Sequence, residues 1–316
     1  MIQKKVLIIT SNRSKTNDWA ERERYVEEFY HNVEESLENT SVTYTTYNDI
    51  TISVINNVVS MRDARHNLAL EDLDLVHFKN WLFDNEHASL IAFYLKQKGV
   101  DFYNQEVDAG LAWGKISQMC RLAVGGVTVP DTFFVKKALL IQLLTESRLP
   151  SNFIFPLIMK ADDGAKGDDN HLINTPEEAV GILRSAPSGK EYVIQNFLPN
   201  DGDYRFLFAG IDLPPLVFMR KAQEGTHLNN TSQGGSGSFV DVASLPKEYL
   251  VYARQAAQIL KREISGVDIL VDKSTRKPYV LEVNSTPAFA TGYGVPQKQA
   301  LFVNFIESHT ELQEEE

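Results

Sequence analysis

The chain opens with a short, continuous apolar run, after which apolar residues recur every three or four positions. The first pattern is typical of a strand buried on both faces, here residues 6–10, and the second of an amphipathic helix over residues 18–37. The alternation then repeats, with strands expected at residues 42–47, 74–81 and 101–104 and a helix at 88–97. Strands that alternate with helices in this way predict a small open α/β lobe.

A different pattern begins after residue 110. From residue 153 onward, β-branched and aromatic runs alternate with turn residues, which predicts a strand-rich region. One helix start stands out within it. Thr175 can cap the helix, Pro176 suits its first position, and Glu178 stands where a capping box has its acid.

The length of the chain allows more than one lobe. With 316 residues it can bury a large core, divided among two or three structural units. We expect an α/β (α+β) fold with an N-terminal domain at residues 1–110 and a second region at 111–316. Within the second region we expect a small lobe at about 155–200 and a C-terminal lobe at about 201–305.

Composition and charge exclude some classes of function. A net charge of −11 argues against general binding to nucleic acid or to anionic membranes. The single cysteine, Cys120, excludes an internal disulfide and is expected to be a small buried residue of a helix. No apolar run has the length of a membrane span or the form of a signal peptide, so a cytoplasmic location is expected.

The most informative segment is a predicted hairpin near the C-terminus. Residues 266–272 and 279–284 read as two strands joined by a polar turn at 273–278. With the turn centred near Thr275, an antiparallel register places Asp268 opposite Glu282. Asn284 is two residues from Glu282 and therefore shares its face of the strand.

Three oxygen ligands thus converge on one face of this hairpin. Like charges directly opposite each other, with Cβ atoms about 4.5–5.5 Å apart, destabilise a sheet. A hard cation resolves the conflict, and the carboxylates of Asp268 and Glu282 with the amide of Asn284 suit Mg²⁺. The alternative is a surface hairpin with scattered acids, which the apolar residues around Glu282 disfavour.

A second candidate site follows a strand that ends in a lysine. Lys160 closes an apolar run, and Gly164 and Gly167 follow it. Glycines let backbone N–H groups approach a phosphate and lysine supplies a charge, so a phosphate cradle is one interpretation. An ordinary turn is the other, and four nearby acids, two of them Asp162 and Asp169, would repel phosphates unless turned outward. The segment is not a Walker A motif.

Two further segments have weaker signals. The strand that contains Gln195 and Asn196 leaves through a polar pair before a proline, and its free backbone groups could bind the edge of an adenine. Arg220 ends another strand and suits a developing negative charge on phosphoryl or acyl oxygens. The long loop at 225–238 that follows has the length of a functional lid.

In order along the chain, these segments resemble the ATP-grasp superfamily, most closely its carboxylate–amine ligases similar to RimK and glutathione synthetase. The resemblance covers about residues 115–294, and the hairpin motifs Gly-Val-Asp-Ile-Leu and Leu-Glu-Val-Asn-Ser-Thr-Pro are its most specific part. It implies an ATP-grasp fold preceded by an open α/β domain, with ATP held between two β-rich lobes.

The resemblance also implies roles for individual residues. For the nucleotide, it implies Lys115, Lys160, the loop residues Gly164, Lys166 and Gly167, the hinge residues Gln195, Asn196, Phe197 and Leu198, the ribose acid Asp203, and the phosphate contact Asn230. For the metal, it implies Asp268, Glu282 and Asn284, with Glu282 bridging two Mg²⁺ ions; Mn²⁺ is an alternative ion. Near the γ-phosphate and the acyl centre it implies Arg205 and Arg220.

The expected reaction is the activation of a carboxylate by ATP, followed by attack of an amine to form an amide. The expected partners are small-molecule or peptide substrates, without nucleic acid or membrane; a homodimer is one option, and the sequence leaves the oligomeric state open. A kinase that phosphorylates a hydroxyl is the alternative, because its nucleotide and metal residues would look the same. A nucleotide-binding module without catalysis is disfavoured by the intact set of Asp268, Glu282 and Asn284.

Overall fold

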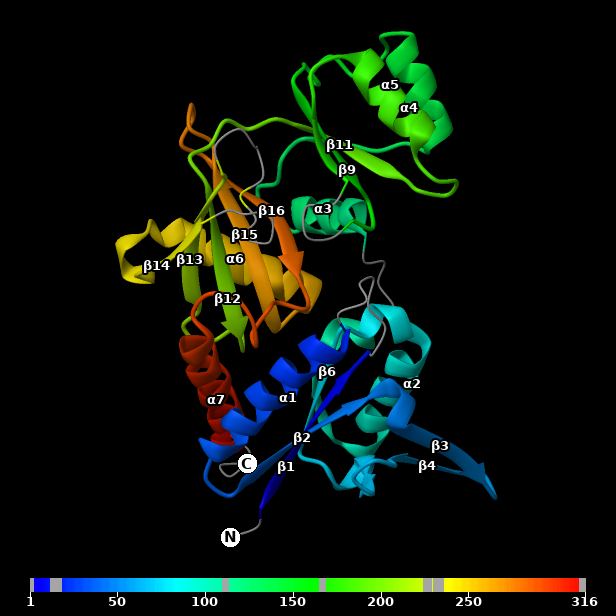
Figure 1. Cartoon of the computed structure of the whole chain (residues 1–316), viewed down its shortest axis with the longest axis vertical. Coiled ribbons are helices and arrows are strands. Elements are labelled where there is room, and N and C mark those ends of the chain that lie inside the picture. Colours follow the sequence, from blue (N-terminus) through cyan, green and yellow to red (C-terminus); the bar gives the residue numbers. More distant parts are fainter. Residues whose placement is uncertain are drawn as a thin grey trace.

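A computed structural model describes residues 3–11, 19–109, 114–164, 169–223, 229 and 236–312. Within these residues the strands form four sheets, which divide the molecule into a lower lobe and two upper lobes (Figure 1). The mixed α/β architecture expected from the sequence is therefore confirmed. The exact domain boundaries stay a prediction.

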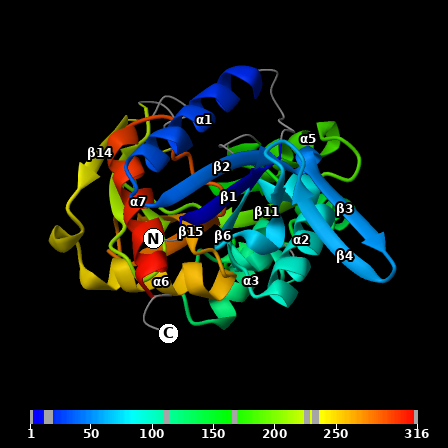
Figure 2. The ribbon, with the colours of Figure 1, turned by 90° about the horizontal axis from the view of Figure 1, so that it is seen from below.

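The lower lobe is built on a parallel sheet with the order β2-β1-β6-β7. Successive residues of the central strand β1 face opposite cores, since Val6 and Ile8 pack with helix α1 whereas Leu7 and Ile9 pack with helix α2. The two helices accordingly lie on opposite sides of the sheet (Figure 2). The bounds of these elements are β1 Lys4–Thr10, α1 Trp19–Glu35, β2 Thr40–Thr46, β6 Leu75–Lys79, α2 Asn85–Lys98 and β7 Asp101–Tyr103.

The sequence analysis missed a hairpin that projects from this lobe (Figures 1 and 2). Strand β3 (Ile50–Ile55) pairs with β4 (Val58–Asp63), and β4 pairs with the short β5 (Leu68–Ala69). Asn56 and Asn57 form the two-residue turn with φ of 51° and 63°. Two positive φ values are what a tight hairpin turn requires and Asn adopts them readily, so the Asn-Asn pair between β-branched runs was the available signal.

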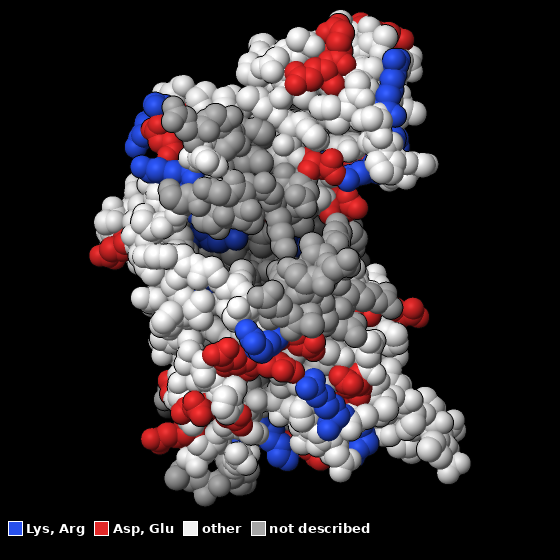
Figure 3. All heavy atoms as spheres, in the orientation of Figure 1, with Lys and Arg blue, Asp and Glu red and all other residues white. Residues whose placement is uncertain are grey.

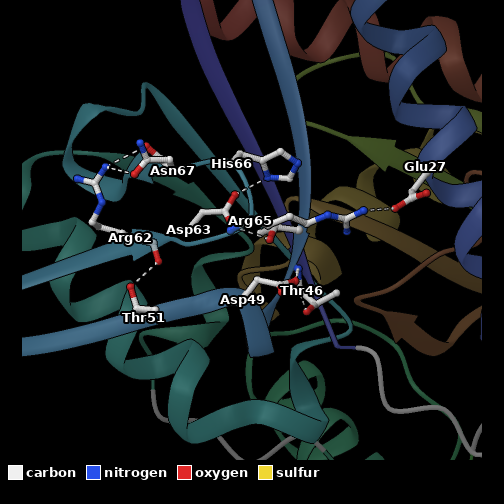
Figure 4. Close-up of polar contacts among 10 residues, drawn as sticks. Glu27, Thr46, Asp49, Thr51, Arg62, Asp63, Arg65, His66 and Asn67 are labelled. Atoms are coloured by element: carbon white, nitrogen blue, oxygen red, sulfur yellow. Dashed lines mark hydrogen bonds and ion pairs between the residues drawn. The ribbon is translucent and has the colours of Figure 1, made fainter.

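A polar cluster ties this hairpin to the sheet (Figure 4). The fully buried carboxylate of Asp63 accepts a hydrogen bond from Thr45 Oγ1 at 3.0 Å and lies 2.6 Å from His66 Nδ1. Arg65 continues the cluster to Glu27 on α1, at 3.1 Å. Because all of these contacts join residues of the lower lobe to one another, the cluster stabilises the base of the hairpin.

The smaller upper lobe is an antiparallel sheet with the order β10-β9-β11-β8, and α4 and α5 cover its outer face (Figure 1). The expected start of α5 is confirmed, because Thr175 Oγ1 accepts a hydrogen bond from the backbone N–H of Glu178 at 3.2 Å. The bounds are β8 Thr132–Phe133, α4 Lys137–Thr145, β9 Leu157–Ala161, β10 Asn170–Ile173, α5 Pro176–Ser185 and β11 Tyr192–Asn196.

The second upper lobe is a five-stranded antiparallel sheet with the order β14-β13-β12-β15-β16. Helices α3 and α6 pack on one face and α7 on the other. The bounds are α3 Lys115–Val124, β12 Asp203–Ala209, β13 Leu216–Lys221, β14 Ser236–Val240, α6 Lys247–Leu260, β15 Ile264–Val271, β16 Pro278–Asn284 and α7 Val295–Leu312.

Two expectations about the helices were wrong or incomplete. Cys120 is exposed, because α3 turns Met119 and Leu122 toward the core instead. Helix α7 was not predicted, since it contacts both α1 and the sheet and therefore has apolar residues on more than one face. No helix within the described residues is long and apolar enough to cross a membrane.

Candidate functional site

A cleft lies between the two upper lobes and helix α3. It has about 840 Å³ of empty space, open solvent included. In the space-filling view, Lys or Arg atoms are visible in a hollow at the height of the upper lobes (Figure 3). The structure brings these predicted residues together around the cleft: Lys115, Lys160, Gln195, Asn196, Phe197, Leu198, Asp203, Asp268 and Glu282.

The β15–β16 hairpin has the predicted register at the site. Asp268 lies opposite Glu282, but the register then shifts, so that Ile269 pairs with Val280. Leu281 is the extra residue of this bulge, and bulges re-aim side chains. Leu281 and Glu282 consequently both line the cleft, although they are neighbours in the chain.

Two arginines reduce the repulsion between the carboxylates of Asp268 and Glu282, in addition to any cation that binds there. Arg205 donates from Nε and Nη2 to the two oxygens of Asp268, both at 2.7 Å. Arg220 Nη2 lies 2.9 Å from the same carboxylate. Burial raises the pKa of Asp268, but the two guanidinium groups outweigh burial and hold that pKa below its usual range. The expectation that a metal alone resolves the conflict therefore needs correction.

Arg220 also binds Asp203, the residue expected at the ribose. Its Nε lies 2.6 Å from Asp203 Oδ1, and both side chains are buried. Burial lowers the pKa of Arg220, but Asp268 and Asp203 raise it by more, so the guanidinium stays charged. The four groups Asp203, Arg220, Asp268 and Arg205 thus form a continuous chain of charges along β12, β13 and β15.

Glu282 and Asn284 keep their oxygens available. Among the described residues, the side chain of Glu282 has no hydrogen bond or ion pair, and it attracts Lys160 electrostatically. Asn284 uses its amide N–H to donate to the Gly266 carbonyl at 3.4 Å, which leaves its side-chain oxygen facing outward from that contact. With Asp268 they form a hard-oxygen donor set that fits Mg²⁺.

The described residues contain no group of three His, Cys, Asp or Glu side chains that could hold a metal. The proposed donor set has only two carboxylates, Asp268 and Glu282, beside the amide of Asn284. Mg²⁺ usually takes one or two carboxylates and completes its shell with water and substrate phosphates.

Two lysines lie across the cleft from these ligands. Burial lowers the pKa of Lys160 to about 8, although the attraction of Glu282 opposes this shift and Lys115 adds to it. Lys115, at the start of α3, donates from Nζ to the Gly164 carbonyl. Lys115 thereby ties the helix to the predicted glycine loop.

Two of the acids near that loop, Asp162 and Asp169, are bound by other groups. Asp162 Oδ1 accepts a hydrogen bond from the backbone N–H of Ile116 at 2.9 Å, at the positive end of α3. A side chain at Gly114 would come within 2.3 Å of this carboxylate, so the carboxylate would have to move to accommodate it. Asp169 pairs with Lys190. Neither acid is left to repel an anion.

The side chains of two hinge residues are engaged by neighbouring segments. The side chain of Gln195 donates to Thr132 Oγ1 at 2.9 Å, and that of Asn196 donates to the Asn152 carbonyl at 3.1 Å. Both side chains therefore fasten the hinge to neighbouring segments. What the hinge can offer a ligand is its backbone and the apolar side chains of Phe197 and Leu198.

Sequence reasoning missed several residues that line the cleft. Strand periodicity could have found two, since Ile158 is two residues before Lys160 and Leu270 is two residues after Asp268. The others have no sequence signal and are brought in by the fold. The missed residues are Met119, Pro130, Ile158, Asn170, Asn200, Asn229, Leu270 and Leu281. The predicted residues Lys166, Gly167 and Asn230 lie outside the described residues.

Comparisons with known proteins identify related sequences. The model of the family described as "RimK-like ATP-grasp domain" matches residues 114–294. A protein named probable alpha-L-glutamate ligase from Teredinibacter turnerae is 29% identical over 231 residues, covering 71% of this chain and 72% of that protein. One of the same name from Syntrophotalea carbinolica is 28% identical over 215 residues, with 66% and 67% covered.

Solved structures resemble the whole chain. D-alanine–D-alanine ligase from Bacillus anthracis, complexed with ATP, has a TM-score of 0.66 at 14% identity and covers 99% of each chain. The ATP-grasp ligase PsnB, complexed with a phosphomimetic variant of its minimal precursor, Mg and ADP, has a TM-score of 0.64 at 14% identity, covering 98% of this chain and all of that one. At such low identity these likenesses show the fold alone, and that fold includes the lower lobe.

Proposed function

Since the chain belongs to the RimK-like ATP-grasp family, we propose that it joins a carboxylate to an amine through an acyl phosphate, with ATP and Mg²⁺. It has the ATP-grasp fold and is an ATP-dependent enzyme of the ligase class. One observation carries the proposal: Asp268 and Glu282, which lie opposite each other in the hairpin, line one cleft together with Lys115 and Lys160.

The described residues suggest how ATP would lie in this cleft. The apolar side chains of Ile158, Leu198 and Leu270 suit the adenine, while Lys115 and Lys160 suit the phosphates. Asp268, Glu282 and Asn284 would hold Mg²⁺, which neutralises charge on the phosphate oxygens when it is bound. We also propose that Lys166, Gly167 and Asn230 contact the nucleotide, and that the chain divides into two domains near residue 110.

The chemistry requires positioning more than reactive side chains. A carboxylate oxygen attacks the γ-phosphorus, the bond from that phosphorus to the bridging oxygen breaks, and ADP leaves. The amine then attacks the acyl carbon, inorganic phosphate leaves, and the amine loses a proton. Arg205 and Arg220 offset the negative charge at the transferring group, and their carboxylate partners keep both guanidinium groups fixed in place.

The substrates are proposed from the relatives. The proteins of similar sequence are named for L-glutamate, so L-glutamate is the first amine to test. A peptide is the second class, because an ATP-grasp ligase of Chryseobacterium gregarium that has a similar fold, with a TM-score of 0.60, was solved with a leader and core peptide. Both classes present a carboxylate and an amine, as the proposed reaction requires.

Trapping with hydroxylamine tests the acyl phosphate. The enzyme is incubated with ATP, Mg²⁺, hydroxylamine and a panel of amino acids and small peptides, and the products are analysed by mass spectrometry. We expect a hydroxamate of one carboxylate, formed together with ADP. A stable phosphate ester of a hydroxyl, without any hydroxamate, would instead identify a kinase.

The titration of Lys160 leads to a prediction about pH. We expect the affinity for ATP without metal to fall by about tenfold between roughly pH 7 and pH 9.5, because the lysine loses its charge as the pH rises through about 8. Calorimetric titration with ATP measures the effect. In Lys160→Arg, whose charge persists over this range, the affinity should change little. An equal decline in both proteins would show that another group is responsible.

A further inference from the structure

A buried polar cluster outside the cleft joins the lower lobe to strand β16. Its charged members are Glu106, 3% exposed, and Arg262, 2% exposed, and beside them lies Asn104, which is fully buried. Asn104 and Glu106 follow the last strand of the lower lobe, whereas Arg262 lies between α6 and β15. None of these residues lines the cleft.

Arg262 connects this cluster to the proposed metal ligands. Its Nε lies 2.6 Å from Glu106 Oε2, and its Nη1 donates to the carbonyl oxygen of Val283. Val283 stands between Glu282 and Asn284 in the chain. The guanidinium group therefore holds the backbone at the residue that separates two of the three proposed ligands.

The other backbone group of Val283 is also held by a side chain. Its N–H donates to Gln118 Oε1 at 3.1 Å, and Gln118 belongs to α3, the helix that begins with Lys115. Strand β16 is the edge of its sheet, so such outward-facing groups have no neighbouring strand. Gln118 and Arg262 take the place of that strand at Val283.

Asn104 secures the ends of both strands of the hairpin. Its Oδ1 accepts a hydrogen bond from the N–H of Ile264 at 2.7 Å, and its Nδ2 donates to the Ile264 and Ser285 carbonyls at 3.1 and 3.2 Å. Ile264 begins β15, and Ser285 directly follows β16. The lower lobe thus contacts the open end of the hairpin, two residues beyond Val283 on β16.

We propose that Glu106, Arg262 and Gln118 position the metal-ligand strand, by fixing Val283 so that Glu282 and Asn284 hold their places around Mg²⁺. This inference rests on the proposed function. A buried ion pair is a weak source of stability, so its value lies in the geometry that it specifies. Metal sites demand ligand positions within about 0.2 Å, and partners that orient ligands typically change metal affinity by about 10–100-fold when removed.

The test measures metal binding directly. Arg262→Met is titrated with Mn²⁺ in the presence of ADP, and free Mn²⁺ is followed by electron paramagnetic resonance. We expect Mn²⁺ affinity to fall by about tenfold or more. ATP binding without metal should stay within about threefold of the parent, because Arg262 is remote from the nucleotide residues. Raising the Mg²⁺ concentration should restore much of the lost ADP formation.

Glu263 provides a matched control in the same interface. Its carboxylate accepts a hydrogen bond from the N–H of Gln105 at 3.0 Å, and it has no contact with Val283. Glu263→Gln should bind Mn²⁺ like the parent protein. Equal affinity for Mn²⁺ in Arg262→Met and in the parent, with both proteins folded, would overturn the proposal.

Loss of folding in Arg262→Met would not remove the test. The double variant Glu106→Gln, Arg262→Met replaces the ion pair by two neutral side chains, so that no unpaired charge is left buried. Burial already raises the pKa of Glu106 and thereby favours its neutral form. Gln118→Leu removes the contact to the Val283 N–H and should also weaken Mn²⁺ binding. Normal Mn²⁺ affinity in both of these variants would also overturn the proposal.

A parallel titration of Glu282→Ala distinguishes this inference from the proposed function. If Glu282→Ala binds Mn²⁺ normally, the metal assignment itself is wrong. If Glu282→Ala loses Mn²⁺ binding while the Arg262, Glu106 and Gln118 variants retain it, the metal site stands and only the positioning role fails.

Discussion

Replacing Glu282 by alanine is expected to lower the rate of ADP formation by roughly a thousandfold, equivalent to about 4 kcal/mol of transition-state stabilisation. The reason is local. Of the two proposed carboxylate ligands, Glu282 is the one without a competing partner among the described residues, since arginines already occupy Asp268. Its loss would leave one carboxylate and one amide to hold Mg²⁺ against the phosphates. The measurement is substrate-dependent ADP release at saturating ATP, over a range of Mg²⁺ concentrations.

Asp272, in the turn of the same hairpin, gives the control for this prediction. Its carboxylate accepts hydrogen bonds from the N–H of Ser274 at 2.8 Å and from Thr275 Oγ1 at 2.9 Å, so its role is confined to the turn. Asp272→Asn should retain ADP formation within about threefold of the parent, as expected for a change remote from the site. Near-normal turnover in Glu282→Ala would refute the metal assignment.

The part of the site that could be predicted from the sequence depends on short-range geometry. The hairpin itself follows from two β-branched runs joined by a short polar turn, whereas Asp268 meets Glu282 only because the bulge at Leu281 compensates a one-residue offset from the predicted register. The start of α5 was also predictable, since the capping residues are only three positions apart. The family motifs added the order of the nucleotide residues along the chain.

The electrostatics of the site could not be predicted in this way. Arg205 and Arg220 reach Asp268 because β12 pairs with both β13 and β15, which the sequence does not reveal. The bulge that brings Leu281 into the cleft beside Glu282 is likewise a property of the paired strands. The sequence therefore identified the carboxylates but not the groups that keep one of them charged.

Long-range packing explains the other omissions. Helix α7 contributes Phe302 to a core shared with Phe29 of α1 and Leu207 of β12, so its apolar residues follow no single helical face. The Glu106–Arg262 pair joins residues 156 positions apart, and neither residue lies in a recognisable motif. Such contacts exist only after the lobes have assembled.

Replacing Asp268 by asparagine is expected to reduce the free energy of unfolding by about 3 kcal/mol, which is typical for breaking a buried ion pair from one side. Asp268 is 5% exposed and pairs with Arg205 and Arg220, so its loss leaves like charges close together in a buried region. Denaturant unfolding near neutral pH measures the difference. ADP formation should be lost in the same variant, because a proposed metal ligand is removed.

The comparison with Asp203→Asn makes this prediction specific. Asp203 contacts only Arg220 within the charge chain, and Arg220 would retain Asp268, so the loss of stability should be smaller. The pH dependence gives a second check. The pKa of Asp268 is depressed in the folded state, so its stabilising effect is present above the unfolded value of about 3.9 and is lost as the pH falls through the lower, folded value. The stability of Asp268→Asn should therefore fall less than that of the parent as the pH is lowered through this range. A loss of stability no larger than in Asp203→Asn would show that Asp268 does not have this central position among the charges.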